Sequence, residues 1–210
     1  MNGISENAML TLKTFEALPA GLLEADATAL AALLGGPSLI HLPGRRPEPL
    51  FLTLLLHGNE TTGFEAVKAV LRRWQGRALP RALSLFIGNV AAARAGLRRL
   101  PGQPDYNRVW PGTETPDLPE AILMAGVVEH MRRRRPFASI DIHNNTGINP
   151  HYACLVRLEP SFLHLARLGY RNFRVTFDRE GAGERVRLFA TADDLVGEQL
   201  LLELILEKRR

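Results

Sequence analysis

The chain has 210 residues, of which 46% are hydrophobic and 23% charged, a balance typical of a globular protein with one substantial core. No apolar run approaches the roughly 20 residues that span a bilayer, and no charged and apolar leader opens the chain, so we expect neither a membrane helix nor a cleaved secretory signal. The formal charge is +4, but the arginines are dispersed without interleaved aromatic residues, which argues against a nucleic-acid partner. We expect one domain over residues 1–210, in the cytoplasm.

Two conspicuous features have structural explanations. The single cysteine, Cys154, lies in an apolar stretch and has no partner for an internal disulfide, so we interpret it as a small buried residue and not as a nucleophile. The arginine run 132–135 follows a helical pattern and precedes Pro136. Cations at that place complement the negative end of a helix dipole, so a solvated helix end is favoured over a phosphate site.

Helical and strand-like patterns alternate along the chain. In chain order, we predict a helix over 22–34, strands over 38–42 and 49–56, a helix over 61–74, a strand over 83–87, a helix over 119–131, strands over 138–142 and 152–156, a helix over 160–168, a hairpin of 173–177 with 186–190, and a helix over 195–207. The Gly/Pro-rich segment 94–119 is long for a structureless connection, and such loops are usually functional. Interleaved strands and helices favour an α/β layer fold with a mixed, mostly parallel sheet.

Three polar residues lie just past the ends of predicted strands. They are His57, Asn89 and His143. In open α/β sheets ligands bind beyond the carboxyl ends of the strands. We therefore expect these residues to lie at one site.

His57, Glu60 and His143 supply two imidazoles and a carboxylate. This is the ligand set of a hydrolytic zinc site that leaves one coordination position for water. The spacing of His57 and Glu60 alone is weak evidence, and a lone histidine at a strand end is more often a hydrogen-bonded structural residue. The pair of strand-end histidines favours a metal, and Asp141 could orient one imidazole.

Three short motifs resemble the succinylglutamate desuccinylase/aspartoacylase group of the zinc carboxypeptidase-like family. They are L-H-G-N-E-T at 56–61, D-Y-N-R-V-W-P-G at 105–112 and D-I-H-N at 141–144. Their order and spacing fit, and the resemblance covers about residues 38–160. It implies a three-layer fold, with helices on both faces of the sheet, and one zinc ion per chain bound by His57, Glu60 and His143.

The resemblance also implies roles for polar residues of the motifs and of the long loop. Asn107 and Arg108 would bind a substrate carboxylate, which suits the paired donors of a guanidinium, and Asn144 is a further substrate-binding candidate. Arg98, which we prefer to Arg99 from its register, would polarise the scissile carbonyl.

The general base is where the sequence departs from this family, because no T-x-E-x-G motif follows Tyr170. Glu180 and Glu184 are the nearest candidates, although both lie in a predicted hairpin turn, where exposed acidic residues are common. The tail 169–210 lacks the resemblance. Truncation, divergence and a reading-frame change would each explain it.

The leading hypothesis is a zinc-dependent hydrolase that cleaves the amide bond of an N-acyl amino acid or a similar small carboxylate. Its alternatives are a carboxypeptidase acting on peptide ends and a metal-binding protein without turnover. Nucleic-acid binding through the arginines is a third, less favoured class. His151 is interpreted as a loop histidine without metal, and His41, His130 and His164 as structural or exposed; the oligomeric state is not specified by the sequence.

Overall fold

The computed structural model describes residues 10–144, 152–155, 159–161, 163–164, 173–178 and 185–190. It divides the chain into two compact units, Met1–Asn144 and Asn145–Arg210. The expectation of a single domain stays a prediction. Within the described part, no helix combines the length and the hydrophobicity needed to cross a membrane.

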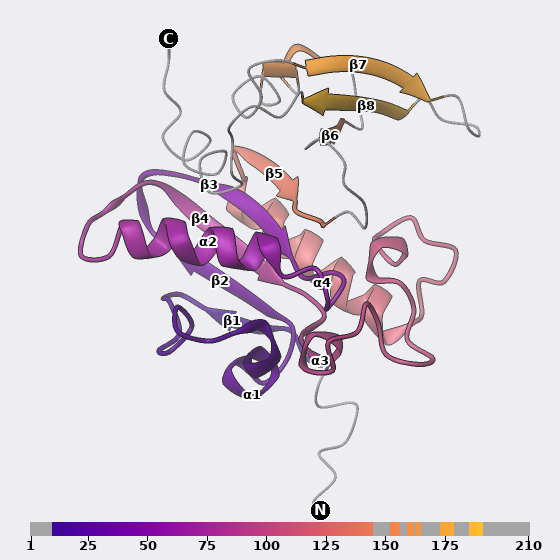
Figure 1. Cartoon of the computed structure of the whole chain (residues 1–210), viewed down its shortest axis with the longest axis horizontal. Helices are drawn as coiled ribbons and strands as arrows, with labels where there is room; N and C mark the ends of the chain where they lie inside the picture. Colours follow the sequence, from indigo (N-terminus) through magenta and orange to yellow (C-terminus); the bar gives the residue numbers. More distant parts are fainter. Residues whose placement is uncertain are drawn as a thin grey trace, which may run out of the picture. The chain divides into compact units, whose positions relative to one another are not determined.

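The first unit is built on a five-stranded sheet (Figure 1). Its strands are β1 (Lys13–Phe15), β2 (Ser38–Leu42), β3 (Gly44–Leu54), β4 (Leu79–Ile87) and β5 (Ala138–Asp141), in the spatial order β1-β2-β4-β3-β5. Only the β2–β4 pair is antiparallel; β1–β2, β3–β4 and β3–β5 are parallel. The prediction of a mixed, mostly parallel sheet is confirmed.

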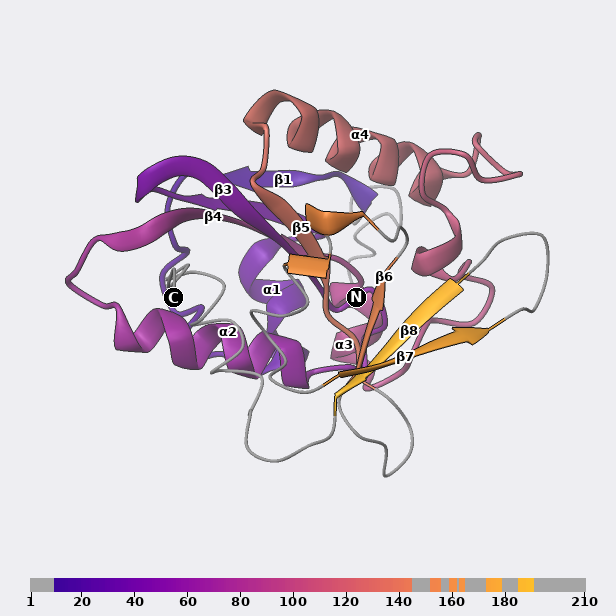
Figure 2. The same cartoon turned by 90° about the horizontal axis from the view of Figure 1, so that it is seen from above.

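Helices cover both faces of this sheet. Figure 2 shows α4 (Pro119–Arg134) on one side, and α1 (Leu30–Leu34), α2 (Thr62–Arg73) and α3 (Val90–Arg94) on the other. Because both faces are covered, the carboxyl half of β3 is continuously buried from Leu50 to Leu54. The three-layer α/β fold expected from the sequence is confirmed.

The helix α2 follows the hydrophobic pattern closely. Phe64, Val67, Val70 and Leu71 recur at helical spacing and are all buried. The predicted and observed bounds differ by one residue at each end. This helix begins two residues after Glu60, so the packing of its buried face also fixes the position of Glu60.

The predicted helix over 22–34 is only partly correct. Residues 21–24 form a turn, followed by a 3-10 helix Ala27–Ala29 and then α1. The carboxylate of Asp26 accepts hydrogen bonds from the backbone nitrogens of Thr28 (2.8 Å) and Ala29 (3.1 Å), so this N-cap starts the helical segment later. The helix ends as expected, at Gly35 with φ 73°.

The second unit contains a three-stranded antiparallel sheet. Its strands are β6 (Tyr152–Leu155), β7 (Phe173–Asp178) and β8 (Arg185–Ala190), in the order β6-β8-β7. The predicted hairpin is therefore confirmed, because β7 and β8 pair from Phe173↔Ala190 to Asp178↔Arg185. The predicted helix over 195–207 lies outside the described residues.

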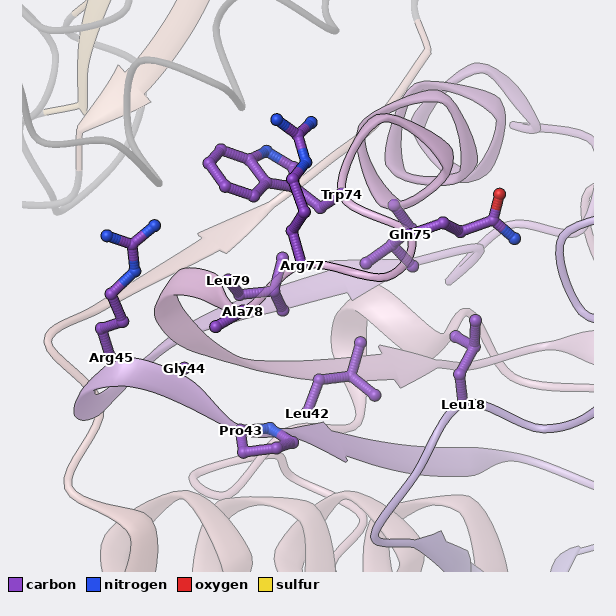
Figure 3. Close-up of a pocket in the computed structure, with 11 residues that line it drawn as sticks. Leu18, Leu42, Pro43, Gly44, Arg45, Trp74, Gln75, Arg77, Ala78 and Leu79 are labelled. Carbon is purple, nitrogen blue, oxygen red and sulfur yellow. The ribbon is translucent and has the colours of Figure 1, made fainter.

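A cavity of about 430 Å³ opens at the amino ends of β3 and β4 (Figure 3). Leu42 and Leu79 contribute apolar surface, and Trp74, Arg45 and Arg77 are among its other lining residues. No histidine, cysteine or carboxylate lines it, so it offers none of the side chains that usually bind a transition metal. His57, Glu60 and His143 instead lie beyond the carboxyl ends of β3 and β5.

Candidate metal centre

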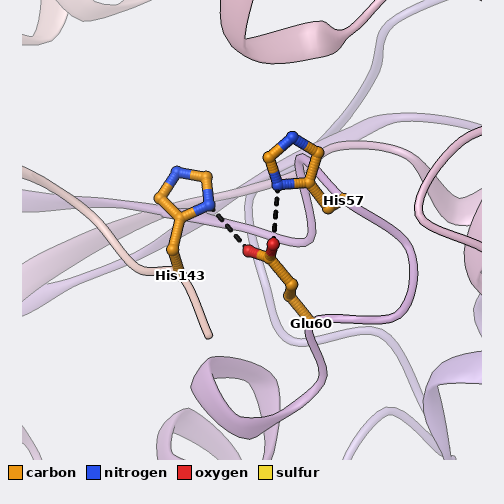
Figure 4. Close-up of side chains that lie close together, drawn as sticks. All are labelled: His57, Glu60 and His143. Carbon is orange, nitrogen blue, oxygen red and sulfur yellow. Dashed lines mark hydrogen bonds and ion pairs between the residues drawn. The ribbon is translucent and has the colours of Figure 1, made fainter. Parts of the chain in front are cut away.

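The side chains of His57, Glu60 and His143 converge (Figure 4). One ligand atom from each lies within 4.8 Å of the others, and among the described residues this is the one such group of three. His57 and Glu60 come from the turn between β3 and α2, and His143 follows β5. Since β3 and β5 are parallel neighbours, their carboxyl ends deliver both histidines to the same edge of the sheet.

The turn that follows β3 is unusually tight. Leu55 has φ 54°, a left-handed conformation that costs a non-glycine residue about 1–2 kcal/mol. The backbone nitrogen of Gly58 donates to the carbonyl of Arg98 at 3.0 Å, and a β-carbon at Gly58 would lie 2.2 Å from the backbone nitrogen of Ala93. Only glycine allows this approach, which places the turn against α3 and the start of the long loop.

Each imidazole is oriented by a carboxylate on its outer nitrogen. The Nε2 of His57 donates to Oδ1 of Asp105 at 2.9 Å, and the Nε2 of His143 donates to Oδ2 of Asp141 at 2.7 Å. An ionised carboxylate only accepts hydrogen bonds, so it places a proton on Nε2 and leaves Nδ1 for another partner. This arrangement is common around histidines that bind metals.

Both Nδ1 atoms face the carboxylate of Glu60. The Nδ1 of His57 lies 2.8 Å from Oε1 and that of His143 lies 2.7 Å from Oε2. The first contact is within ion-pair distance, yet the buried Nδ1 of His57 has no hydrogen-bond partner. A buried nitrogen lone pair facing a carboxylate oxygen is unfavourable unless a cation lies between them.

The three residues therefore fit a zinc ion. Two imidazole nitrogens and one carboxylate are the donors of known catalytic zinc sites, and ligands at about 2 Å from one ion lie roughly 3–4 Å apart. Small side-chain adjustments within the observed 4.8 Å reach that spacing.

The cluster perturbs the pKa values of its members in opposite directions. Burial lowers the pKa of His143, but its hydrogen bonds to Asp141 and Glu60 and their negative charges outweigh burial and raise it to about 9. Burial raises the pKa of Glu60, but the hydrogen bond from His143, the charges of both histidines and the Asn144 N–H together lower it. The site thus stabilises positive charge between its carboxylates.

Arg98, the preferred arginine of the long loop, lies at the cluster. Its Nη1 donates to Oε1 of Glu60 at 2.9 Å, and its Nη2 lies 3.6 Å from Oδ2 of Asp105. The side chain is half exposed, at 51%. Arg99 instead donates from Nη1 to the carbonyl of Gln103 at 3.2 Å, so its guanidinium is used within the loop.

The proposed substrate-binding residues surround the same edge. The Nδ2 of Asn107 lies 3.4 Å from Nε2 of His143, and the backbone nitrogen of Asn144 donates to Oε2 of Glu60 at 3.2 Å. Arg108 is exposed and contacts the carbonyl of Asn107 at 3.4 Å. Their roles stay predictions. Glu180, Glu184 and His151 lie outside the described residues.

The structure places Asn89 and Asp105 in ways that were not predicted. Asn89 was expected to belong to the site, but its Oδ1 caps α3 through the nitrogen of Ala92 (3.1 Å) and its Nδ2 donates to Gln103 (2.8 Å). Asp105 belongs to the motif at 105–112, and its contact with His57 was not predicted. The two residues are 48 positions apart, and nothing local in the sequence indicates that they pair.

Two solved structures are similar to part of this chain. One is the crystal structure of succinylglutamate desuccinylase from Chromobacterium violaceum, with 28% sequence identity, coverage of 52% of this chain and 38% of that chain, and a TM-score of 0.42. The other is the X-ray structure of succinylglutamate desuccinylase from Vibrio parahaemolyticus, with 15% identity, coverage of 53% of this chain and 40% of that chain, and a TM-score of 0.43. The matched region thus spans about two fifths of each of those chains. No curated protein sequence matches the chain.

A family model also matches the chain. The model of the succinylglutamate desuccinylase/aspartoacylase catalytic domain matches residues 49–178, more than half of the chain. This range includes all three motifs and the converging side chains, and it extends beyond the 38–160 range of the resemblance at the carboxyl side. The chain belongs to the succinylglutamate desuccinylase/aspartoacylase catalytic-domain family.

Proposed function

We propose that this protein is a zinc-dependent deacylase that hydrolyses the amide bond of an N-acyl amino acid or a similar small carboxylate. The observation that carries the proposal is the convergence of His57, Glu60 and His143, with both histidines oriented by carboxylates. Membership of a family named for desuccinylases and aspartoacylases supports this reaction class. The protein acts in the cytoplasm on a small-molecule substrate, without a nucleic-acid partner.

The residues around the cluster would bind different groups of the substrate. Arg98 is half exposed and lies 2.9 Å from Glu60, so its guanidinium can turn from that carboxylate to a substrate carbonyl and stabilise the negative charge that develops on the oxygen. Arg108 is exposed at the same edge and has donors free for a substrate carboxylate, which a guanidinium binds through two parallel hydrogen bonds. Asn107, next to Arg108 in the chain, and Asn144, whose backbone nitrogen contacts Glu60, would add amide groups for substrate binding.

Zinc held by the three ligands would activate a water molecule and polarise the acyl carbonyl. A general base must take the proton from that water and return it to the leaving amine. Within the described residues, Asp105 and Asp141 are the other carboxylates at the cluster, and both are engaged with histidines. Glu180 or Glu184 therefore remains our candidate for this function.

The test combines zinc analysis with hydrolysis assays on the full chain. We expect one zinc ion per chain, lost in His57→Ala and His143→Ala and kept in the control His164→Ala, whose side chain is exposed. The zinc-loaded protein should release the acyl group from N-succinyl or N-acetyl amino acids. Glu180→Gln or Glu184→Gln should abolish this release.

The alternatives give different results in the same experiment. Release of terminal residues from short peptides, without deacylation, would identify a carboxypeptidase. Stoichiometric zinc without any turnover would identify a metal-binding protein that has lost its general base. Turnover that survives both glutamine substitutions would exclude Glu180 and Glu184 as the base.

A further inference from the structure

The loop between α3 and α4 carries most of the polar residues around the metal centre. Arg98, Asp105, Asn107 and Arg108 all belong to it, and its one regular element is the 3-10 helix Tyr106–Arg108. A loop of this length must be held by side-chain contacts if its polar groups are to keep fixed positions.

The side chain of Gln103 makes such contacts in three directions. Its Oε1 accepts hydrogen bonds from Nδ2 of Asn89 at 2.8 Å and from the backbone nitrogen of Leu100 at 3.1 Å. Its Nε2 donates to the hydroxyl of Tyr106 at 3.2 Å. One amide group therefore links the end of β4, the middle of the loop and the 3-10 helix.

Both ends of this link are firmly placed. Asn89 is 1% exposed, and its backbone nitrogen donates to the carbonyl of Leu55 at 2.7 Å, two residues before His57. Tyr106 is 2% exposed and packs in the core beside Phe86 and Val109. Gln103 is thus held between two buried residues, and its position is determined by the core.

The first residue after Gln103 that contacts a candidate metal ligand is Asp105. Asp105 is two residues beyond Gln103 and immediately precedes Tyr106; its Oδ1 holds both Nε2 of His57 (2.9 Å) and the backbone nitrogen of Asn107 (2.9 Å). A shift of the loop at Gln103 would therefore move the carboxylate that orients His57.

We propose that Gln103 is a positioning residue, which fixes the loop so that Asp105 orients His57 and so that Asn107, Arg108 and Arg98 face the substrate. The part that concerns substrate rests on the proposed deacylase function. The parts that concern zinc binding and loop order do not, and they can be measured separately.

The decisive variant is Gln103→Met, which keeps the size of the side chain and removes its hydrogen bonds. We expect zinc affinity, measured by competition with a chromogenic chelator at 15 °C, to fall about 3- to 10-fold, less than the roughly 10- to 100-fold typical of a direct partner of a ligand. Hydrogen exchange at the backbone nitrogens of Leu100 and Asn107 should become faster. For an N-acyl amino acid substrate, KM should rise several-fold and more than kcat falls.

Two further variants separate positioning from a general loss of stability. Gln103→Glu keeps the acceptor for Asn89 and Leu100 and can accept from the Tyr106 hydroxyl, so zinc affinity and exchange rates should return to within twofold of the wild type. Gln75→Met is the matched control, because Gln75 is exposed and lines the cavity at the opposite edge of the sheet. It should change none of these quantities.

The inference is overturned if Gln103→Met binds zinc and exchanges loop amides like the wild type, whatever its melting temperature, because Gln103 would then be merely structural. A protein that binds zinc but hydrolyses nothing would refute the deacylase proposal, while the zinc competition would still test Gln103. If the wild type binds no zinc, amide exchange in the loop still decides between the outcomes.

If Gln103→Met does not fold, Tyr106→Phe replaces it, because this variant removes the hydrogen bond between Gln103 and the Tyr106 hydroxyl. It should change zinc affinity and amide exchange in the same direction but by less. No effect would overturn the inference.

Discussion

The histidines of the first unit differ in how their ring nitrogens are partnered. His57 and His143 each have a carboxylate near both nitrogens, an environment that favours a cation. His41 is 4% exposed; its Nδ1 is bonded to the Ser84 hydroxyl at 2.9 Å and its Nε2 is buried without a partner. The same side chain thus serves a charged site in one place and a neutral core in the other.

We predict that His41 makes the protein less stable in mild acid. Burial lowers the pKa of His41 below its ordinary value of 6.5, as do the charges of Arg134 and His130, against an opposing effect of Glu16. The unfolded chain takes up a proton near pH 6.5 whereas the folded chain resists it, so stability is fully present above that pH and is lost as the pH falls below it, by at most about 1.4 kcal/mol per pH unit.

Urea unfolding at pH 7.5, 6.5 and 5.5 checks this prediction. His41→Gln should lose less stability than the wild type between pH 7.5 and 5.5. His164→Gln, at an exposed position, should follow the wild type. Equal pH dependence in the wild type and His41→Gln would contradict the prediction.

At the scale of elements, the turn between β3 and α2 joins the sheet to the long loop. The backbone nitrogen of Gly58 donates to the Arg98 carbonyl. The side chain of Asn89 caps α3 through its Oδ1 and donates from its Nδ2 to Gln103. These hydrogen bonds therefore hold the residues that follow β3 and β4 against the long loop. A change at any of these contacts is expected to reach the metal centre.

We predict that Gly58→Ala destabilises the protein by about 3 kcal/mol. The new β-carbon would lie 2.2 Å from the nitrogen of Ala93 and 2.4 Å from the carbonyl carbon of Ala92, and backbone atoms cannot move aside as a side chain can. Gly126→Ala in α4 is the control, because its β-carbon would have an ordinary 3.8 Å contact with Leu12. Since alanine is favoured over glycine within a helix, this variant should raise the free energy of unfolding by about 0.5–1 kcal/mol. Urea unfolding of both variants measures the difference, and a Gly58→Ala protein as stable as the wild type would refute the prediction.

At the scale of the whole molecule, the proposed zinc ligands are brought together from distant parts of the chain. Glu60 and His143 are 83 positions apart and belong to different strand exits. A ligand that binds only the folded state stabilises it by about 2.7 kcal/mol at a concentration of 100 times its dissociation constant. Zinc is therefore expected to stabilise the fold as well as to act in catalysis.

We predict that zinc at this concentration raises the melting temperature of the chelator-treated protein by roughly 5–10 °C, as expected for a chain of this length. Thermal unfolding, followed by circular dichroism with and without zinc, measures the shift. His143→Ala should remove most of it. An equal shift in wild type and variant would mean that zinc binds elsewhere.

Much of the local structure was predictable from the sequence. The helical spacing of Phe64, Val67, Val70 and Leu71 predicted α2 almost to the residue, and Pro119 indicated the start of α4. The observed β4 begins four residues before its predicted start, at Leu79, and β1 and α3 were not predicted at all. These segments are short or partly polar, and pairing with neighbours determines them more than their own pattern does.

The sequence by itself determined which residues follow the buried strands and which donor types they offer, because hydrophobic periodicity and side-chain chemistry are local properties. Only the tertiary structure decided the strand order β1-β2-β4-β3-β5, the pairing of His57 with Asp105, and the use of Asn89 as the cap of α3 and as a hydrogen-bond donor to Gln103. Each of these depends on contacts between residues that are distant or irregularly spaced in the chain, and such contacts form only when the whole core packs.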